Sequence, residues 1–141
     1  MSLDDLYRET ILDHYSHPRN KGALPGADVT GEGANPLCGD EIRIFLMVRD
    51  GLVQDVQFDG KGCSISQASA SMMTELIKGK AIEEAHRLIA SFKEMIRGAP
   101  AGEDLGDLEA LQGVRRFPVR VKCATLGWVT LEGALKDLAP R

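Results

Sequence analysis

Three cysteines, Cys38, Cys63 and Cys123, are the residues of this chain that are best suited to chemistry. Cysteine thiolates act as nucleophiles and as soft metal ligands, and an odd number of cysteines does not suit a framework of structural disulfides. Asp40 follows Cys38 by two residues, so its carboxylate can reach the same ion. Three sulfur donors and one oxygen donor make four, the number that a tetrahedral zinc ion or an iron–sulfur centre requires. The alternative at this point is that the cysteines are buried and act as small apolar side chains.

The wide spacing of these residues predicts how a metal site would relate to folding. Zinc fingers place ligands in pairs a few residues apart, whereas these cysteines can meet only through the tertiary structure. We therefore expect the domain to fold first and to exchange a bound metal without unfolding.

Hydrophobic periodicity predicts the elements that must position the cysteines. Helical spacing predicts helices over residues 3–15, 64–78 and 82–96, a short amphipathic helix within 98–113, and a last helix that begins just after Cys123. Alternation over residues 42–58, interrupted by Asp50-Gly51, predicts an antiparallel hairpin, and a short strand is expected around residues 27–34. Cys63 and Cys123 would then directly precede helices, whose N-terminal amides favour a thiolate.

The predicted elements give an α+β fold, with a small antiparallel sheet of about three strands and helices packed on one face and at both chain ends. A length of 141 residues, 43% of them hydrophobic and 27% charged, is typical of a single globular domain. The insert at about residues 99–117 is acidic and glycine-rich, and such excursions often carry partner contacts. We therefore expect one domain over residues 1–141 with this insert as a candidate partner surface.

Charge and hydropathy exclude several classes of function. A net charge of -4 argues against binding to the nucleic-acid backbone. No apolar run approaches the roughly 20 residues that span a bilayer, and residues 1–12 carry acidic and basic side chains where a signal peptide would be apolar. We therefore expect a cytoplasmic protein whose partner is a folded protein or a small ligand, with no membrane and no nucleic acid involved.

Three segments resemble the signature segments of the U-type iron–sulfur cluster assembly scaffolds, the family of IscU and of the N-terminal part of NifU. They are Asn35-Pro-Leu-Cys-Gly-Asp40, Gly60-Lys-Gly-Cys-Ser-Ile-Ser66 and Val121-Lys-Cys-Ala-Thr-Leu126. The scaffold branch of that family has a histidine immediately before its last cysteine, where this chain has Lys122. Together with the insert, this difference resembles the zinc-dependent SufU branch.

The resemblance implies both a cofactor and a partner. It implies a zinc ion held by Cys38, Asp40, Cys63 and Cys123. It also implies that the chain accepts persulfide sulfur from a cysteine desulfurase of the SufS type, which uses pyridoxal phosphate, and passes it on to cluster assembly or acceptor proteins. Whether such an acceptor counts as a sulfurtransferase enzyme or as a non-enzymatic scaffold stays open.

Within the implied chemistry, we predict Cys123 as the sulfur acceptor. Its predicted position at a helix N-terminus and the basic side chains of Arg120 and Lys122 would favour an incoming anionic persulfide. Arg120, on the stretch that leads to Cys123, is expected to pair with Asp40.

Three other functions use the same residues. The first is a scaffold that assembles a [2Fe–2S] cluster on the four ligands and transfers it to apo-proteins, since iron–sulfur and zinc sites share thiolate ligands. The second is a redox thiol protein, which the lack of a Cys-x-x-Cys pair disfavours. The third is a structural zinc domain, which predicts that the chain unfolds when the metal is removed.

Overall fold

The computed structural model describes residues 3–100 and 104–138, with side chains described from Tyr7 onward. The elements in chain order are α1 Leu3–Ser16, β1 Val29–Asn35, β2 Asp40–Arg49, β3 Leu52–Lys61, α2 Ser64–Ile77, α3 Ile82–Ile96, the 3₁₀ helix η1 Gly106–Arg116 and α4 Pro118–Asp137. This order confirms the α+β prediction. Among the described residues, no helix is both long and apolar enough to cross a membrane.

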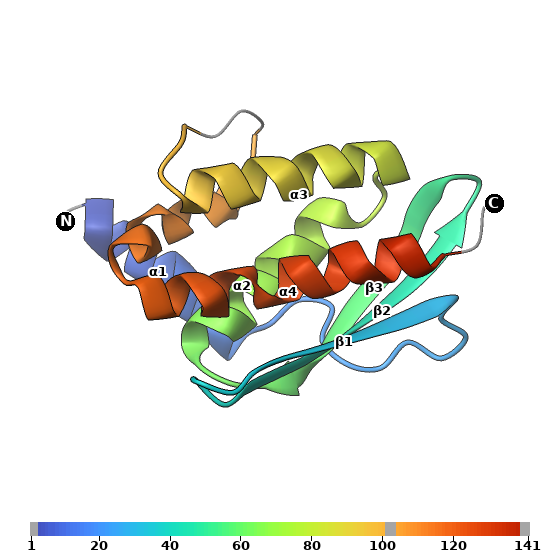
Figure 1. Ribbon diagram of the computed structural model, residues 1–141, viewed down its shortest axis with the longest axis horizontal. Helices are drawn as coiled ribbons and strands as arrows, with labels where there is room; N and C mark the ends of the chain where they lie inside the picture. The colour runs from blue at the N-terminus through green and yellow to red at the C-terminus, as the bar shows by residue number, and fades with distance from the viewer. Residues whose placement is uncertain (1–2, 101–103, 139–141) are drawn as a thin grey trace.

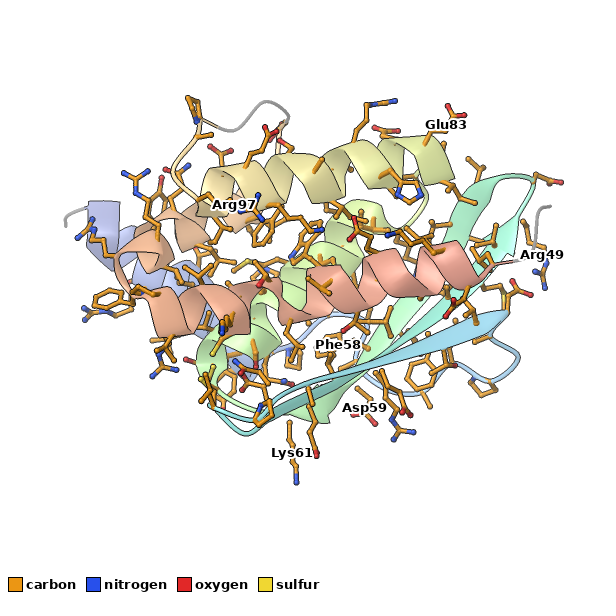
Figure 2. The ribbon with its side chains drawn as sticks, in the orientation of Figure 1. Arg49, Phe58, Asp59, Lys61, Glu83 and Arg97 are labelled. Carbon is orange, nitrogen blue, oxygen red and sulfur yellow. The ribbon has the colours of Figure 1, made fainter. Side chains whose placement is uncertain are left out.

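The sheet has three antiparallel strands in the order β1-β2-β3. Asp50 and Gly51 both have positive φ, 56° and 75°, as a tight two-residue hairpin requires, and they join β2 to β3 where the sequence predicted the turn. Alternate residues of β2 are buried, with Ile42 and Ile44 facing the helices. On β3, Phe58 points toward the helices, and Lys61 extends away from them (Figure 2). One face of the sheet is therefore covered, and the other faces solvent.

Helices α2 and α4 cover the inner face of the sheet, and α3 packs against α4 on the far side (Figure 1). Phe92 of α3 stacks on Trp128 of α4, with ring centroids 4.5 Å apart and planes 9° from parallel. The indole Nε1 of Trp128 donates a hydrogen bond to Ser69 Oγ at 3.2 Å, and Ser69 donates to the carbonyl of Ala124 at 2.7 Å. The buried indole and hydroxyl are therefore paired, which keeps the cost of burying them low.

Two elements differ from the sequence prediction. The amphipathic segment between α3 and α4 forms a 3₁₀ helix, and its residues Leu108 and Leu111 belong to the hydrophobic core. Helix α4 begins at Pro118 rather than just after Cys123. Proline suits the first helical position, because its fixed φ is helical and the amide hydrogen that it lacks would have no partner there. The alternation of Val119 and Val121 had suggested an extended approach to Cys123, and that interpretation was wrong.

Candidate metal centre

The turn between β1 and β2 positions Cys38 and Asp40. Asn35 and Asp40 are paired across the ends of the two strands, so the four residues between them form the turn. Gly39 has a φ of +68°, a conformation that side chains rarely adopt, and the Cys38 amide donates to the Asn35 carbonyl at 3.2 Å. Asp40 is 1% exposed, whereas Cys38 is half-buried at the turn. The turn thus presents one thiol near the surface and one carboxylate below it.

Cys63 is held against Asp40 by the connection from β3 to α2. The Cys63 amide donates to Asp40 Oδ1 at 2.8 Å, and the Cys63 thiol lies 4.0 Å from Asp40 Oδ2. Gly62 has a φ of +154°, and a Cβ at this position would collide with Asp40 Oδ1. Glycine is therefore required here for the strand end to approach Asp40. Cys63 is the N-cap residue of α2, as the sequence predicted.

Cys123 approaches the same point from α4. Its Sγ lies 3.0 Å from Cys38 Sγ, and the Asn35 side-chain amide donates to it at 3.6 Å. The thiol is fully buried. Burial raises the pKa of Cys123 well above its usual range, and hydrogen bonds with Cys38, Asp40 and Cys63 raise it further. The sequence prediction that a helix N-terminus makes this thiol acidic was wrong, because the helix-terminal effect fades within the first turn and Cys123 lies beyond it.

The four predicted ligands therefore lie together, although they come from the β1–β2 turn, the start of α2 and the first part of α4, which Figure 1 shows at one end of the sheet. Donor atoms of Cys38, Asp40 and Cys123 all lie within 4.8 Å of one another, and Cys63 joins them through its 4.0 Å separation from Asp40. Bonds of about 2.0–2.3 Å to a tetrahedral ion place ligand atoms roughly 3.3–3.8 Å apart. The donor chemistry of the four residues and the close grouping of Cys38, Asp40 and Cys123 fit a zinc ion, and Cys63 lies next to that group through Asp40.

Arg120 does not occupy the place that the sequence predicted. Arg120 belongs to helix α4 rather than to an extended stretch, and its exposed guanidinium lies beside Cys63. The negative charge of a Cys63 thiolate, followed by a hydrogen bond to it, raises the pKa of Arg120. The predicted pair with Asp40 is thus replaced by a contact with the neighbouring cysteine.

Comparison with known proteins places this arrangement in a family. The NifU-like N terminal domain model matches residues 6–141, a range that includes all three cysteine segments. The chain belongs to this family. The zinc-dependent sulfurtransferase SufU of Bacillus subtilis (strain 168) is 53% identical over 139 residues, 96% of this chain and 94% of that protein. The iron–sulfur cluster assembly scaffold protein IscU of Thermotoga maritima is 44% identical over 135 residues, 95% of each chain.

Solved structures of the NifU-like family share the fold. The crystal structure of a nitrogen-fixing NifU-like protein (N-terminal) from Brucella abortus superposes with a TM-score of 0.87 at 25% identity and covers 96% of each chain. The resemblance that the three cysteine segments suggested is therefore confirmed for the family and for the fold.

Sequence reasoning missed two residues of the centre. Asn35 is buried and donates to the Cys123 sulfur, and Gly62 allows the backbone to reach Asp40. An asparagine before proline reads as an ordinary turn residue, and Gly62 reads as the end of a strand. The sequence feature that could have identified Asn35 and Gly62 is their position inside the cysteine segments.

A second group of ligand-type side chains lies between α1, α2 and η1. His14 is fully buried, and its Nε2 lies 3.0 Å from Asp107 Oδ2 and 3.7 Å from Glu75 Oε1. Its Nδ1 is hydrogen-bonded to Ser71 Oγ at 2.8 Å. His14 of α1 is therefore joined to Ser71 of α2 and to Asp107 of η1.

Proposed function

We propose that this chain is a zinc-bound sulfur acceptor in iron–sulfur cluster assembly, and that its sulfur donor is a cysteine desulfurase of the SufS type, which uses pyridoxal phosphate. The observation that carries the proposal is the meeting of three thiols and one buried carboxylate at one end of the sheet. It is supported by 53% identity to a protein named as a zinc-dependent sulfurtransferase.

Four side chains would hold the zinc ion: Cys38, Asp40, Cys63 and Cys123. When bound, zinc keeps its thiol ligands deprotonated at neutral pH and protects them from oxidation. Asp40 is a hard oxygen donor among soft sulfur donors, so its bond is the weakest of the four and the first to exchange. Asp40 also holds the Cys63 amide, so the site keeps its shape when the carboxylate is released from the metal.

Cys38 is the thiol that we assign as sulfur acceptor. It lies half-buried on the β1–β2 turn beside the exposed Gly39, whereas Cys123 is fully buried within α4. A donor persulfide on a large enzyme can reach a thiol on a turn but not one below the surface. The sequence favoured Cys123 because of a helix N-terminus, and the structure places that terminus at Pro118. Cys123 therefore serves as a ligand in this proposal.

The transfer step needs only these thiols and the donor. The Cys38 thiolate attacks the outer sulfur of the donor persulfide, and a new S–S bond forms on Cys38 as the S–S bond of the donor breaks. The donor cysteine leaves as a thiolate, and the outer sulfur keeps its proton or negative charge. No oxidant or reductant is consumed. Arg120, exposed beside Cys63, attracts the anionic persulfide to this end of the sheet.

A second candidate function is supported by the 44% identity to an iron–sulfur cluster assembly scaffold. In that case iron and sulfide are the cargo, and the same four donors hold a [2Fe–2S] cluster until it is transferred to an apo-protein. The two functions differ in what the purified protein contains, because a bound cluster contributes iron, acid-labile sulfide and colour.

We further propose that residues 1–141 act as one domain. Leu108 and Leu111 of the insert belong to the same hydrophobic core as the residues of the sheet and the long helices. In this proposal the insert at about residues 99–117 is part of the folded unit.

The deciding experiment measures metal content and sulfur transfer together. We expect about one zinc ion per chain and no iron after anaerobic purification. After incubation with a SufS-like desulfurase and cysteine, mass spectrometry should find a persulfide on Cys38. Iron with acid-labile sulfide would favour the scaffold, and a wild-type chain that accepts no sulfur would contradict the proposal.

Asp40 provides a sharper test of the site. We expect Asp40→Ala to lower zinc affinity and sulfur transfer by about tenfold or more, while the chain still folds. Asp40→Asn is the matched control, because its side-chain oxygen can still accept the Cys63 amide but carries no charge. If Asp40→Ala transfers sulfur at the wild-type rate, Asp40 has no role in delivery.

A further inference from the structure

A groove of about 640 Å³ lies beside the metal centre, between α1, η1 and the first residues of α2 and α4. Tyr7 and Leu12 line it from α1, and Phe117 lines it at the junction between η1 and α4. Ser64 and Arg120 line the end next to the metal centre, since Ser64 follows Cys63 and Arg120 lies one helical turn before Cys123 on α4. The groove therefore leads along the surface to the Cys63 side of the metal centre.

The charge of the groove is opposite to that of the whole chain. Arg8, Arg116 and Arg120 line it, and none of the described residues that line it is acidic. The chain carries a net charge of -4, so this is a local reversal of sign. Arginine guanidinium groups bind carboxylates through paired hydrogen bonds and attract other anions, including a persulfide. The groove thus suits an occupant that carries negative charge.

The groove and its surroundings also expose large apolar side chains. Phe117 is 61% exposed and Leu12 is 48% exposed, and both line the groove. Leu37, next to Cys38, and Val119, whose carbonyl lies 3.7 Å from the Cys123 sulfur, are exposed at the metal centre itself. Grouped apolar residues of this kind mark interaction surfaces, and aromatic and arginine side chains contribute most of the affinity there.

We propose that this groove binds the segment of the cysteine desulfurase that carries the persulfide. This inference rests on the proposed function and assigns its partner surface. The occupant is an extended segment with apolar side chains for Phe117 and Leu12 and acidic side chains for Arg8 and Arg116. Bound along the groove, the segment brings its sulfur to the end where Arg120 lies beside Cys63. The 3₁₀ helix of the insert supplies one wall, which gives the insert the partner role that its composition suggested.

Two single substitutions, Arg8→Glu and Phe117→Ala, test the surface without touching the metal ligands or Arg120. Both side chains are exposed, so the variants should fold, which thermal melting checks. The readout is the concentration of this chain that gives half-maximal alanine formation from cysteine by a SufS-like desulfurase. We expect each variant to raise that concentration about tenfold, with the maximal rate and the zinc content unchanged.

Matched controls are Arg97→Glu and Leu52→Ala, two exposed residues outside the groove lining. Figure 2 labels Arg97 at the end of α3. We expect both controls to stay within about twofold of the wild-type half-saturating concentration. Groove variants that also stay within that range, while the wild-type chain accepts sulfur, would overturn the assignment.

Two further outcomes are distinguishable. If sedimentation shows that the wild-type chain dimerises and that Phe117→Ala abolishes the dimer, the groove binds a second copy, and the inference is wrong. If the wild-type chain neither stimulates the desulfurase nor accepts sulfur, the proposed function itself fails, whatever the variants do.

Discussion

The metal centre and the His14 group both gather metal-ligating side chains from distant parts of the chain, yet they are built in opposite ways. At the metal centre, Cys38 lies half-buried on a turn, and the thiols have hydrogen-bond contacts with one another, with Asp40, with Asn35 and with the Val119 carbonyl. Thiols are weak hydrogen-bond donors, so such contacts satisfy little of their capacity. The thiol sulfur atoms of the centre therefore stay available to bind a metal ion or to accept sulfur.

At the His14 group, every polar atom of the imidazole is already paired. Nε2 is hydrogen-bonded to the Asp107 carboxylate at 3.0 Å, and Nδ1 is hydrogen-bonded to Ser71 Oγ at 2.8 Å. The oxygen of Ser71 also accepts from the Arg19 amide at 2.8 Å. These hydrogen bonds join α1 to α2 and η1, and they leave neither imidazole nitrogen of His14 available to a metal ion. Proximity of ligand-type residues is thus not enough for a site, because the hydrogen bonds already made decide between a reactive centre and a structural joint.

The largest expected effect in this comparison comes from Cys38. We expect Cys38→Ser to lower sulfur transfer about a hundredfold or more, because the nucleophile is lost, while the free energy of unfolding of the metal-free chain changes by less than about 1 kcal/mol at this half-buried position. Persulfide mass spectrometry and urea unfolding measure the two quantities. Near-normal transfer by Cys38→Ser would return the acceptor role to another thiol, with Cys123→Ser as the next variant.

Substitution of His14 should lower stability and leave sulfur transfer almost unchanged, the reverse of the effect expected for Cys38. We expect His14→Ala to lower the free energy of unfolding by about 2–4 kcal/mol, because it opens a cavity and removes one of the two hydrogen-bond partners of the buried Ser71 hydroxyl. Sulfur transfer per folded molecule should change little. The exposed His17, which lies 3.6 Å from Asp13, provides the control, and His17→Ala should cost less than about 0.5 kcal/mol. A His14→Ala chain that unfolds normally but fails in transfer would make the His14 group a functional site.

The ion pair between Lys93 of α3 and Glu132 of α4 should give the smallest change in the free energy of unfolding. It serves as a reference for the changes at the metal centre and at the His14 group. Lys93 Nζ lies 2.7 Å from Glu132 Oε1, and this hydrogen bond lowers the pKa of Glu132 below its ordinary value of 4.5. A lowered folded-state pKa contributes stability above the unfolded-state pKa and loses it as the pH falls through the folded-state value. We expect Glu132→Gln to cost about 0.5 kcal/mol at pH 7 and less at pH 3, measured by urea unfolding. An equal cost at both pH values would mean that packing, not charge, links the two helices.

Local patterns were sufficient for most elements. The Asp50-Gly51 turn, the alternation on both sides of it and the helix that follows Cys63 were predictable because each depends on neighbouring residues. The start of α4 was not, because Val119 and Val121 alternate as in a strand, while the proline at the first helical position and the packing of α4 favour the helix. That one difference changed the environment of Cys123 from a helix end to the interior.

The sequence by itself determined the family and identified a set of candidate donor residues, because residue type and motif spacing carry that information directly. Only the tertiary structure decided how they are used. Which thiol is buried, which residue Arg120 contacts and why His14 is a joint all depend on pairs far apart in the chain, such as Cys38 with Cys123 and His14 with Asp107. Local propensity does not encode such pairs, since burial and hydrogen-bond partners arise only when the sheet and helices pack together.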